Sequence, residues 1–250
     1  MSTSQEHPIA KRLSGWAVFD LDGTLADSLS DISLALSKVL RRHHRNSLSL
    51  EETKKLVGKG PRTLVERAWL ATGEPASEEQ ARELTGEYLL EYRSNPKGGT
   101  RAFPGIHEGL RRLFSLGWSL GLCTNKDGRA ARFLVEELGW EKWIRVVVSG
   151  EETTRKPDPL PLRLALRRMK APPGRHLFIG DSEVDLQTAR NARVEGVFLS
   201  HGYGEFGSVS RDGMHHMGTA AELFSWMARA GPRPASAPPR SGFAKLPGNF

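Results

Sequence analysis

Four apolar segments of this chain are each followed by a small set of polar residues, and this pattern strongly constrains the fold. The first apolar segment, 16–19, has the length and composition of a buried strand, and it runs directly into the polar segment 20–24. Apolar segments at 120–123, 146–148 and 177–179 precede the other three polar sets. If these segments are parallel strands, the polar sets converge at one edge of the sheet, where open α/β sheets bind ligands.

The four polar sets supply candidate catalytic and metal-binding side chains. Asp20 and Asp22 stand two residues apart, and Gly23 permits a turn that would bring both carboxylates to one ligand. A Mg²⁺ ion near them would relieve their repulsion. An ordinary Asp-Gly turn would explain this first set by itself. It does not explain the other sets, which add a hydroxyl, a lysine and a second carboxylate pair: Thr124, Lys156, and Asp181 with Asp185.

These sets match, in order, the four motifs of the haloacid dehalogenase-like hydrolases, and the chain resembles the phosphoglycolate phosphatase-type members of that family. The resemblance runs from about residue 18 to residue 203 and includes less general stretches at 56–60, 100–105, 124–126 and 155–159. It implies an α/β fold with a doubly wound, parallel, Rossmann-like sheet core and an inserted α-helical cap. It also implies a phosphoric monoester hydrolase that uses Mg²⁺ as its cofactor.

The motif residues suggest a covalent mechanism. Asp20 is the candidate nucleophile, which would attack phosphorus and form an aspartyl-phosphate. Asp22 is the candidate general acid for the leaving oxygen and then the base for the attacking water, a double role that the resemblance implies. Thr124 and nearby amides would hold phosphoryl oxygens, and Lys156 would balance the charge of nucleophile and phosphate.

The predicted metal site draws on both carboxylate pairs. We expect Mg²⁺ to bind the carboxylates of Asp20 and Asp181 and the main-chain carbonyl of Asp22. Asp185 follows Asp181 by four residues, so on a helix it would share a face with Asp181 and orient Lys156 or a water on the metal. The alternative role for Asp185 is that of a first-turn acid favoured by the helix dipole.

Three further residues are predicted to contact substrate: Asn125, Lys59 and Arg62. Lys59 stands between two glycines in the expected cap, where a mobile cationic loop would meet a substrate carboxylate. A solvent-exposed turn lysine is the alternative interpretation of Lys59, and Arg62 is a weaker version of the same prediction. The best single substrate is 2-phosphoglycolate, although the segment 92–100 lacks a histidine that phosphoglycolate phosphatases often have there.

Other functions remain open at this stage. The same motifs would serve a pyrophosphatase, a nucleotidase or a β-phosphoglucomutase-like phosphotransferase, because the cap decides among these substrates. A non-catalytic binding protein with this fold would usually have lost one of the four main motif residues, and all four are present: Asp20, Asp22, Lys156 and Asp181.

Composition narrows the class of protein. The formal net charge is +7, and the segment 231–250 holds three basic residues and no acid, so the remainder of the chain is only mildly basic. We find no basic stripe interleaved with aromatics and no apolar run near the roughly 20 residues that span a bilayer. We therefore expect a small phosphorylated metabolite as partner, no nucleic acid and no membrane, and a monomer or homodimer. The one cysteine, Cys123, suits a cytoplasmic protein and is expected to be buried and unreactive.

The order of the expected elements predicts the domain organisation. After the first strand we expect no further strand before about residue 118, and helical spacing predicts a cap at 30–100, while 14–29 and 101–230 form the core. Flexible ends are expected at 1–13 and, as a disordered, Pro-rich basic tail, at 231–250. In the core, predicted helices at 106–116, 128–138, 159–169 and 184–192 alternate with predicted strands at 118–123, 144–148 and 176–180 and a last short strand at 196–200.

Overall fold

Six parallel strands form the central sheet of the core in the order β5-β4-β1-β6-β7-β8. The computed structural model describes residues 15–94, 98–204 and 214–230. The strands are β1 (Gly15–Phe19), β4 (Trp118–Cys123), β5 (Ile144–Val148), β6 (His176–Gly180), β7 (Glu195–Leu199) and β8 (Met214–Met217). The carboxyl ends of all the strands therefore meet at one edge of the sheet. The predicted doubly wound parallel sheet is confirmed.

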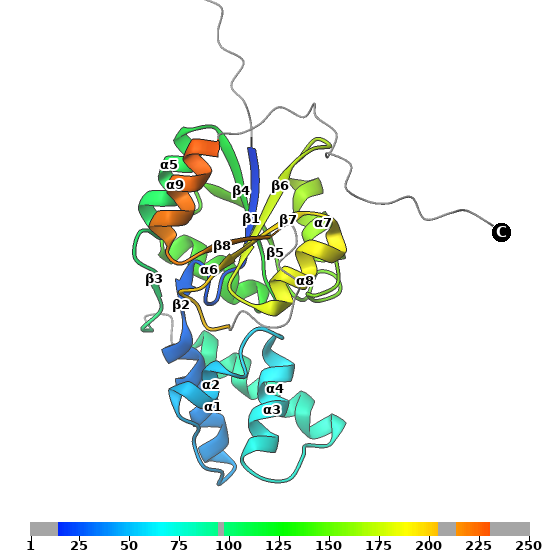
Figure 1. Ribbon diagram of the computed structural model, residues 1–250. Coiled ribbons are helices and arrows are strands. Elements are labelled where there is room, and N and C mark those ends of the chain that lie inside the picture. The colour runs from blue at the N-terminus through cyan, green and yellow to red at the C-terminus, as the bar shows by residue number, and fades with distance from the viewer. Residues whose placement is uncertain (1–14, 95–97, 205–213, 231–250) are drawn as a thin grey trace, which may run out of the picture.

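Helices cover both faces of the sheet (Figure 1). Helices α5, α6 and α9 share one apolar cluster with the sheet, whereas α7 packs against the opposite face and α8 lies beside it. The core helices are α5 (Ile106–Ser115), α6 (Gly128–Glu137), α7 (Leu160–Arg168), α8 (Glu183–Ala192) and α9 (Ala220–Ala230). Strand β1 lies between β4 and β6, so it is buried on both faces and at both edges, and its end lies at the centre of the sheet.

A second group of helices forms the cap, which lies beyond the carboxyl ends of the strands (Figure 1). Its helices are α1 (Leu29–Arg42), α2 (Leu50–Lys54), α3 (Pro61–Ala71) and α4 (Glu78–Arg93). They bury an apolar cluster of their own, with members from Ile32 to Tyr88. The predicted domain limits at 29/30 and 100/101 stay predictions, and the expected terminal segments 1–13 and 231–250 lie outside the described residues.

Serine side chains cap two helices of the cap domain to different extents. Ser49 and Glu52 make a complete capping box at α2, whereas Ser77 accepts only the Gln80 amide at α4. At the end of α8 the sequence has Arg193 where the family pattern has glycine, and Arg193 adopts the left-handed conformation at φ 60°. The helix ends there as in the family pattern, at the cost of backbone strain that a glycine would avoid.

The sequence analysis missed four short or late elements: β2 (Ala26–Asp27), β3 (Arg101–Ala102), β8 and α9. Strands β2 and β3 pair where the chain leaves and re-enters the core, so the expectation of no strand before about residue 118 was wrong. These strands have two residues each, too few to show a periodic pattern. The predicted strand near 196–200 is not the last, because β8 pairs with β7 at the sheet edge. Helix α9 does show helical spacing of buried residues, at Ala220, Leu223, Phe224 and Met227.

Candidate active site

The turn after β1 places the first carboxylate pair at the centre of the sheet edge. The Asp20 amide donates to the Ile179 carbonyl at 2.8 Å, and beyond it the chain turns through Gly23, which has φ +85°. A Cβ atom on Gly23 would lie 2.2 Å from Oδ2 of Asp181, so only glycine fits this close approach. Asp20 and Asp22 both line the cavity that opens above the turn.

Three buried carboxylates meet at this edge. Asp20, Asp181 and Asp185 each offer an oxygen within 4.8 Å of the others, and in the part of the chain that the structure describes these three are the group of acidic residues that could hold a metal ion. Burial raises the pKa of Asp20 to about 7, with Lys156 acting against burial and with Asp185 and Asp181 adding to it. Burial and then Asp185 raise the pKa of Asp181 to about 6.

Lys156 supplies the positive charge beneath this cluster. Its Nζ lies 2.7 Å from Oδ1 of Asp20 and 2.6 Å from Oδ1 of Asp185, and all three side chains are almost completely buried. Burial opposes the charged form of Lys156, but the neighbouring Asp185 and Asp20 outweigh it and raise the pKa of Lys156. Asp185 thus orients Lys156, and it also completes a capping box with Ser182 at the start of α8. Both roles considered for Asp185 are present at once.

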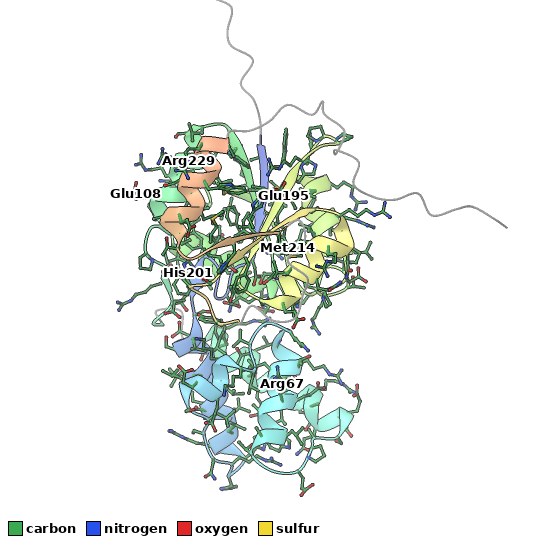
Figure 2. All side chains as sticks on the ribbon, in the orientation of Figure 1. Arg67, Glu108, Glu195, His201, Met214 and Arg229 are labelled. Carbon is green, nitrogen blue, oxygen red and sulfur yellow. The ribbon has the colours of Figure 1, made fainter. Side chains whose placement is uncertain are left out.

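Main-chain and hydroxyl donors fix Asp181. Thr24 Oγ1 donates to Oδ1 of Asp181 at 2.8 Å, and the amide of Tyr203 donates to Oδ2 at 2.8 Å. Tyr203 belongs to the loop after β7, near His201, which Figure 2 shows at the end of the core that faces the cap. The Tyr203 hydroxyl accepts from the Ser28 amide at 2.6 Å, so this one residue joins the carboxylate cluster to the entrance of the cap.

The chemistry of this donor set fits Mg²⁺. Three buried carboxylates are accompanied by one buried lysine, so negative charge exceeds positive charge in the cluster, and burial raises the pKa values of Asp20 and Asp181. A small divalent cation that prefers oxygen ligands would relieve that excess. Asp20, Asp181 and Asp185 are the carboxylates that would surround it.

Thr124 and Asn125 follow β4 and lie beside Asp20. Thr124 is buried, lines the cavity, and its amide donates to the Val148 carbonyl at 3.0 Å. The Asn125 side chain accepts from the Lys156 amide at 2.8 Å and donates to the carbonyls of Lys156 and Gly58, both at 3.0 Å. Asn125 therefore holds the main chain of Lys156 in place and connects it to Gly58 of the cap.

Lys126 is a residue of the site that the sequence analysis did not predict. Its Nζ lies 2.9 Å and 3.0 Å from the two carboxylate oxygens of Asp22, and its side chain is 6% exposed. Ser28, which was not predicted either, donates to Asp22 Oδ1 at 2.5 Å. The one sequence signal for Lys126 was its place in a stretch shared with the resembled family, because nothing in its spacing shows that it reaches Asp22.

The cap closes over the cavity mainly with apolar side chains and two tyrosines. The cavity is small, about 50 Å³, and its cap residues include Ile32, Val57, Leu64, Tyr88 and Tyr92. At the rim of this region Arg93, at the end of α4, pairs with Asp127, the N-cap of α6 in the core.

The two cap cations predicted to bind substrate are not brought to the cavity wall. Lys59 is exposed, and only the glycines on either side of it line the cavity. Arg62 pairs with Glu66 at 2.8 Å and with Glu78, both of them cap residues.

Cys123 ends β4 directly before Thr124 and is fully buried. Burial raises the pKa of its thiol to about 12, so the thiolate needed for nucleophilic attack is disfavoured. The expectation of a buried cysteine is confirmed. In the described residues, moreover, no helix has the length and apolar character required to cross a membrane.

Comparison with known proteins agrees with this geometry. The family model for haloacid dehalogenase-like hydrolases matches residues 17–199. A phosphoglycolate phosphatase of Cereibacter sphaeroides is 35% identical over 187 residues, which cover 74% of this chain and 85% of that protein. A phosphoglycolate phosphatase of Rhodospirillum rubrum is 35% identical over 215 residues, covering 84% of this chain and 89% of that one.

Solved structures show the same fold. The crystal structure of a predicted phosphoglycolate phosphatase from Haemophilus somnus has a TM-score of 0.76 at 22% identity, covering 87% of this chain and 99% of that one. The family match spans most of the chain and includes Asp20, Thr124, Lys156 and Asp181. The chain belongs to the haloacid dehalogenase-like hydrolases, as a phosphoric monoester hydrolase of the phosphoglycolate phosphatase type.

Proposed function

We propose that this chain is a Mg²⁺-dependent phosphatase that hydrolyses a small phosphate monoester through an aspartyl-phosphate on Asp20, and that 2-phosphoglycolate is its best candidate substrate. One observation carries the proposal: the Asp20 carboxylate lines the cavity while it contacts Lys156 and lies beside Asp181 and Asp185. The relatives named phosphoglycolate phosphatase support the choice of substrate.

In the first step a carboxylate oxygen of Asp20 forms a bond to phosphorus, and the bond from phosphorus to the ester oxygen breaks. The leaving oxygen takes a proton from Asp22. Thr124, on the cavity wall, would hold a phosphoryl oxygen, and Lys156 offsets the repulsion between the attacking carboxylate and the phosphate. Mg²⁺, held by Asp20, Asp181, Asp185 and the main-chain carbonyl of Asp22, would supply further positive charge beside the phosphoryl group.

In the second step a water attacks phosphorus of the aspartyl-phosphate and gives its proton to Asp22. The bond from phosphorus to Asp20 breaks, and inorganic phosphate and the free carboxylate are restored. The same residue thus acts first as acid and then as base, which requires that its carboxylate stay in one place through both steps. Ser28 and Lys126 hold it there.

A substrate panel tests the proposal. The purified chain is assayed with 2-phosphoglycolate, pyrophosphate, a nucleoside monophosphate and β-glucose 1-phosphate, each with Mg²⁺, with Ca²⁺ and with a chelator. We expect the highest kcat/KM for 2-phosphoglycolate, no hydrolysis with the chelator, and no rescue by Ca²⁺, whose looser coordination would misplace the nucleophile. Activity that resists the chelator would exclude the metal-dependent mechanism, and a preference for another ester would change the substrate alone.

We also propose a cytoplasmic enzyme whose partner is a small phosphorylated metabolite, with neither nucleic acid nor membrane bound. The small cavity, about 50 Å³, supports a small substrate. A monomer or homodimer is expected, and gel filtration with light scattering distinguishes the two.

A further inference from the structure

One cation lines the cavity among the described residues, and it comes from the core. Lys156 lies beneath Asp20 and is held between two carboxylates, and neither Lys59 nor Arg62 is a wall residue. Lys126 is the wall residue that carries a positive charge. A substrate with an acidic group apart from its phosphate would therefore find its counter-charge at Lys126.

The Lys126 ammonium is held between core and cap. It contacts both oxygens of Asp22 at 2.9 Å and 3.0 Å, and it lies 4.3 Å from the centre of the Tyr92 ring on α4. Tyr88, on the same cap helix, lines the cavity beside Tyr92. The ammonium is almost completely removed from water, so it gains most from an anion brought into the same cavity.

The position of Lys126 relative to Asp22 determines which part of a substrate it would meet. In the proposed mechanism Asp20 and Thr124 face the phosphoryl group, and Asp22 faces the leaving oxygen. Because Lys126 is bonded to Asp22, it lies on the leaving-group side of the site. A carboxylate one carbon from the ester oxygen would fall next to the ammonium, inside the same cavity.

We propose that Lys126 determines specificity by binding the carboxylate of a small acidic leaving group. This inference rests on the proposed phosphatase function and names the residue that would select among esters. A neutral leaving group would leave Lys126 paired with Asp22 alone and gain nothing from the charge. A purely structural Lys126, which only orients Asp22, would instead support hydrolysis of every ester to the same degree.

Two esters of nearly equal size separate these roles: 2-phosphoglycolate, which has a carboxylate, and 2-hydroxyethyl phosphate, which has a hydroxyl in its place. Wild type and Lys126→Met are assayed with both, with Mg²⁺ present. We expect the ratio of kcat/KM for the acidic ester to that for the neutral one to fall by about 10- to 100-fold in Lys126→Met, the range for a lost hydrogen bond to a charged group. Most of that change should lie in KM for the acidic ester, and Lys126→Arg should recover part of the ratio.

Binding provides a second measurement that does not depend on turnover. In an Asp20→Asn background, adding Lys126→Met should weaken calorimetric binding of 2-phosphoglycolate by about the same 10- to 100-fold. It should change binding of 2-hydroxyethyl phosphate by less than about threefold. Lys142→Met, which removes an exposed charge outside the cavity, is the matched control.

Several outcomes would overturn the proposal. An equal fall for both esters would assign Lys126 to the orientation of Asp22 alone. A shift of the ratio in Lys59→Met but not in Lys126→Met would move the specificity to the cap loop. A wild type that prefers the neutral ester would reject the acidic leaving group while leaving the phosphatase intact, whereas a wild type that hydrolyses neither ester would reject the proposed function as well.

Discussion

The core and the cap meet at one cavity, but they contribute different chemistry to it. The core side supplies the carboxylates of Asp20 and Asp22, the hydroxyl of Thr124 and the ammonium of Lys126. The cap side supplies apolar surface and two tyrosines, and in the described part of the chain none of its charged residues lines the cavity; Arg62, for example, pairs with Glu66 and Glu78. We infer that bond breaking belongs to the core, whereas the cap excludes water and limits the size of the substrate.

The largest effect is expected at the nucleophile. Asp20→Asn should lower kcat by at least about 10⁴-fold, because an amide does not attack phosphorus and the covalent step is lost. Steady-state hydrolysis of 2-phosphoglycolate measures the effect, with Glu136→Gln on the exposed face of α6 as the control. Turnover near the wild-type level in Asp20→Asn would contradict the covalent mechanism.

A smaller loss is expected at the buried lysine of the core. Lys156→Met should lower kcat/KM by about 10²- to 10³-fold, because no charge would then offset the repulsion between Asp20 and the phosphate. The control Lys142→Met removes the same charge at an exposed position and should leave kcat/KM within about twofold of the wild-type value. If the two variants behaved alike, the ion pairs of Lys156 with Asp20 and Asp185 would have no part in catalysis.

Binding of Mg²⁺ should depend on pH in a defined direction. The pKa values of Asp20 and Asp181 are raised to about 7 and about 6, so the stability that these groups give the metal-free protein is full below pH 4 and is lost as pH rises through 6 and 7. Protons and metal compete for the same oxygens. Adding Mg²⁺ should therefore raise the free energy of unfolding more at pH 8 than at pH 5.5, by on the order of 2 kcal/mol. This difference corresponds to several degrees in Tm.

Asp181→Asn is the control for this competition. It removes one of the two carboxylates, and it should flatten the pH dependence of the Mg²⁺ effect and stabilise the metal-free protein near pH 7. Thermal scans with and without Mg²⁺ measure both. An equal rise in Tm at both pH values would show that the cluster is not where the metal binds.

Loss of the Tyr203 hydroxyl, which connects the core to the start of the cap, should reduce activity less than the substitutions above. Tyr203→Phe deletes a hydroxyl that accepts from the amides of Ser28 and Leu29 and donates to Asp27 at 2.8 Å. We expect a loss of about 1–3 kcal/mol in the free energy of unfolding, and a fall of a few-fold in kcat because Ser28 also holds Asp22. Chemical denaturation and steady-state kinetics measure these. An unchanged free energy of unfolding and an unchanged kcat would show that the connection between core and cap does not depend on this hydroxyl.

The smallest effect is expected in the cap. Arg62 is about one-third exposed and its partners are cap glutamates, so Arg62→Met should leave the stability nearly unchanged and change KM by less than about threefold. A rise in KM of tenfold or more would show that Arg62 leaves its glutamates to contact substrate, and would place part of the recognition on the cap.

The sequence alone was most informative where pattern and chemistry coincide. The strands at 118–123, 144–148 and 176–180 were predicted with their observed bounds, because each is an apolar run of strand length that ends at a polar set. A parallel sheet then requires these sets to meet at one edge. Asp20, Lys156 and Asp181 are candidates from the sequence for this reason.

Contacts between side chains that lie far apart in the sequence could not be predicted in the same way. Lys126 and Asp22 are separated by 104 residues, and Tyr203 and Ser28 by 175, so no local spacing shows that they touch. Lys59 and Arg62 looked suitable for substrate because they are cationic and lie in the expected cap. Whether such a residue faces the cavity depends on the rotation of its helix or loop, which is set by packing.

The sequence by itself determined the fold class, the candidate carboxylates and the presence of a cap, since hydrophobic periodicity and strand-end polar residues are local properties. Only the tertiary structure decided which cation lines the cavity among the described residues, what holds Asp22 and how Tyr203 connects the buried carboxylate cluster to the cap. Those contacts join segments far apart in the chain, and they form only when buried charges and hydroxyls find partners within hydrogen-bonding distance in a packed interior.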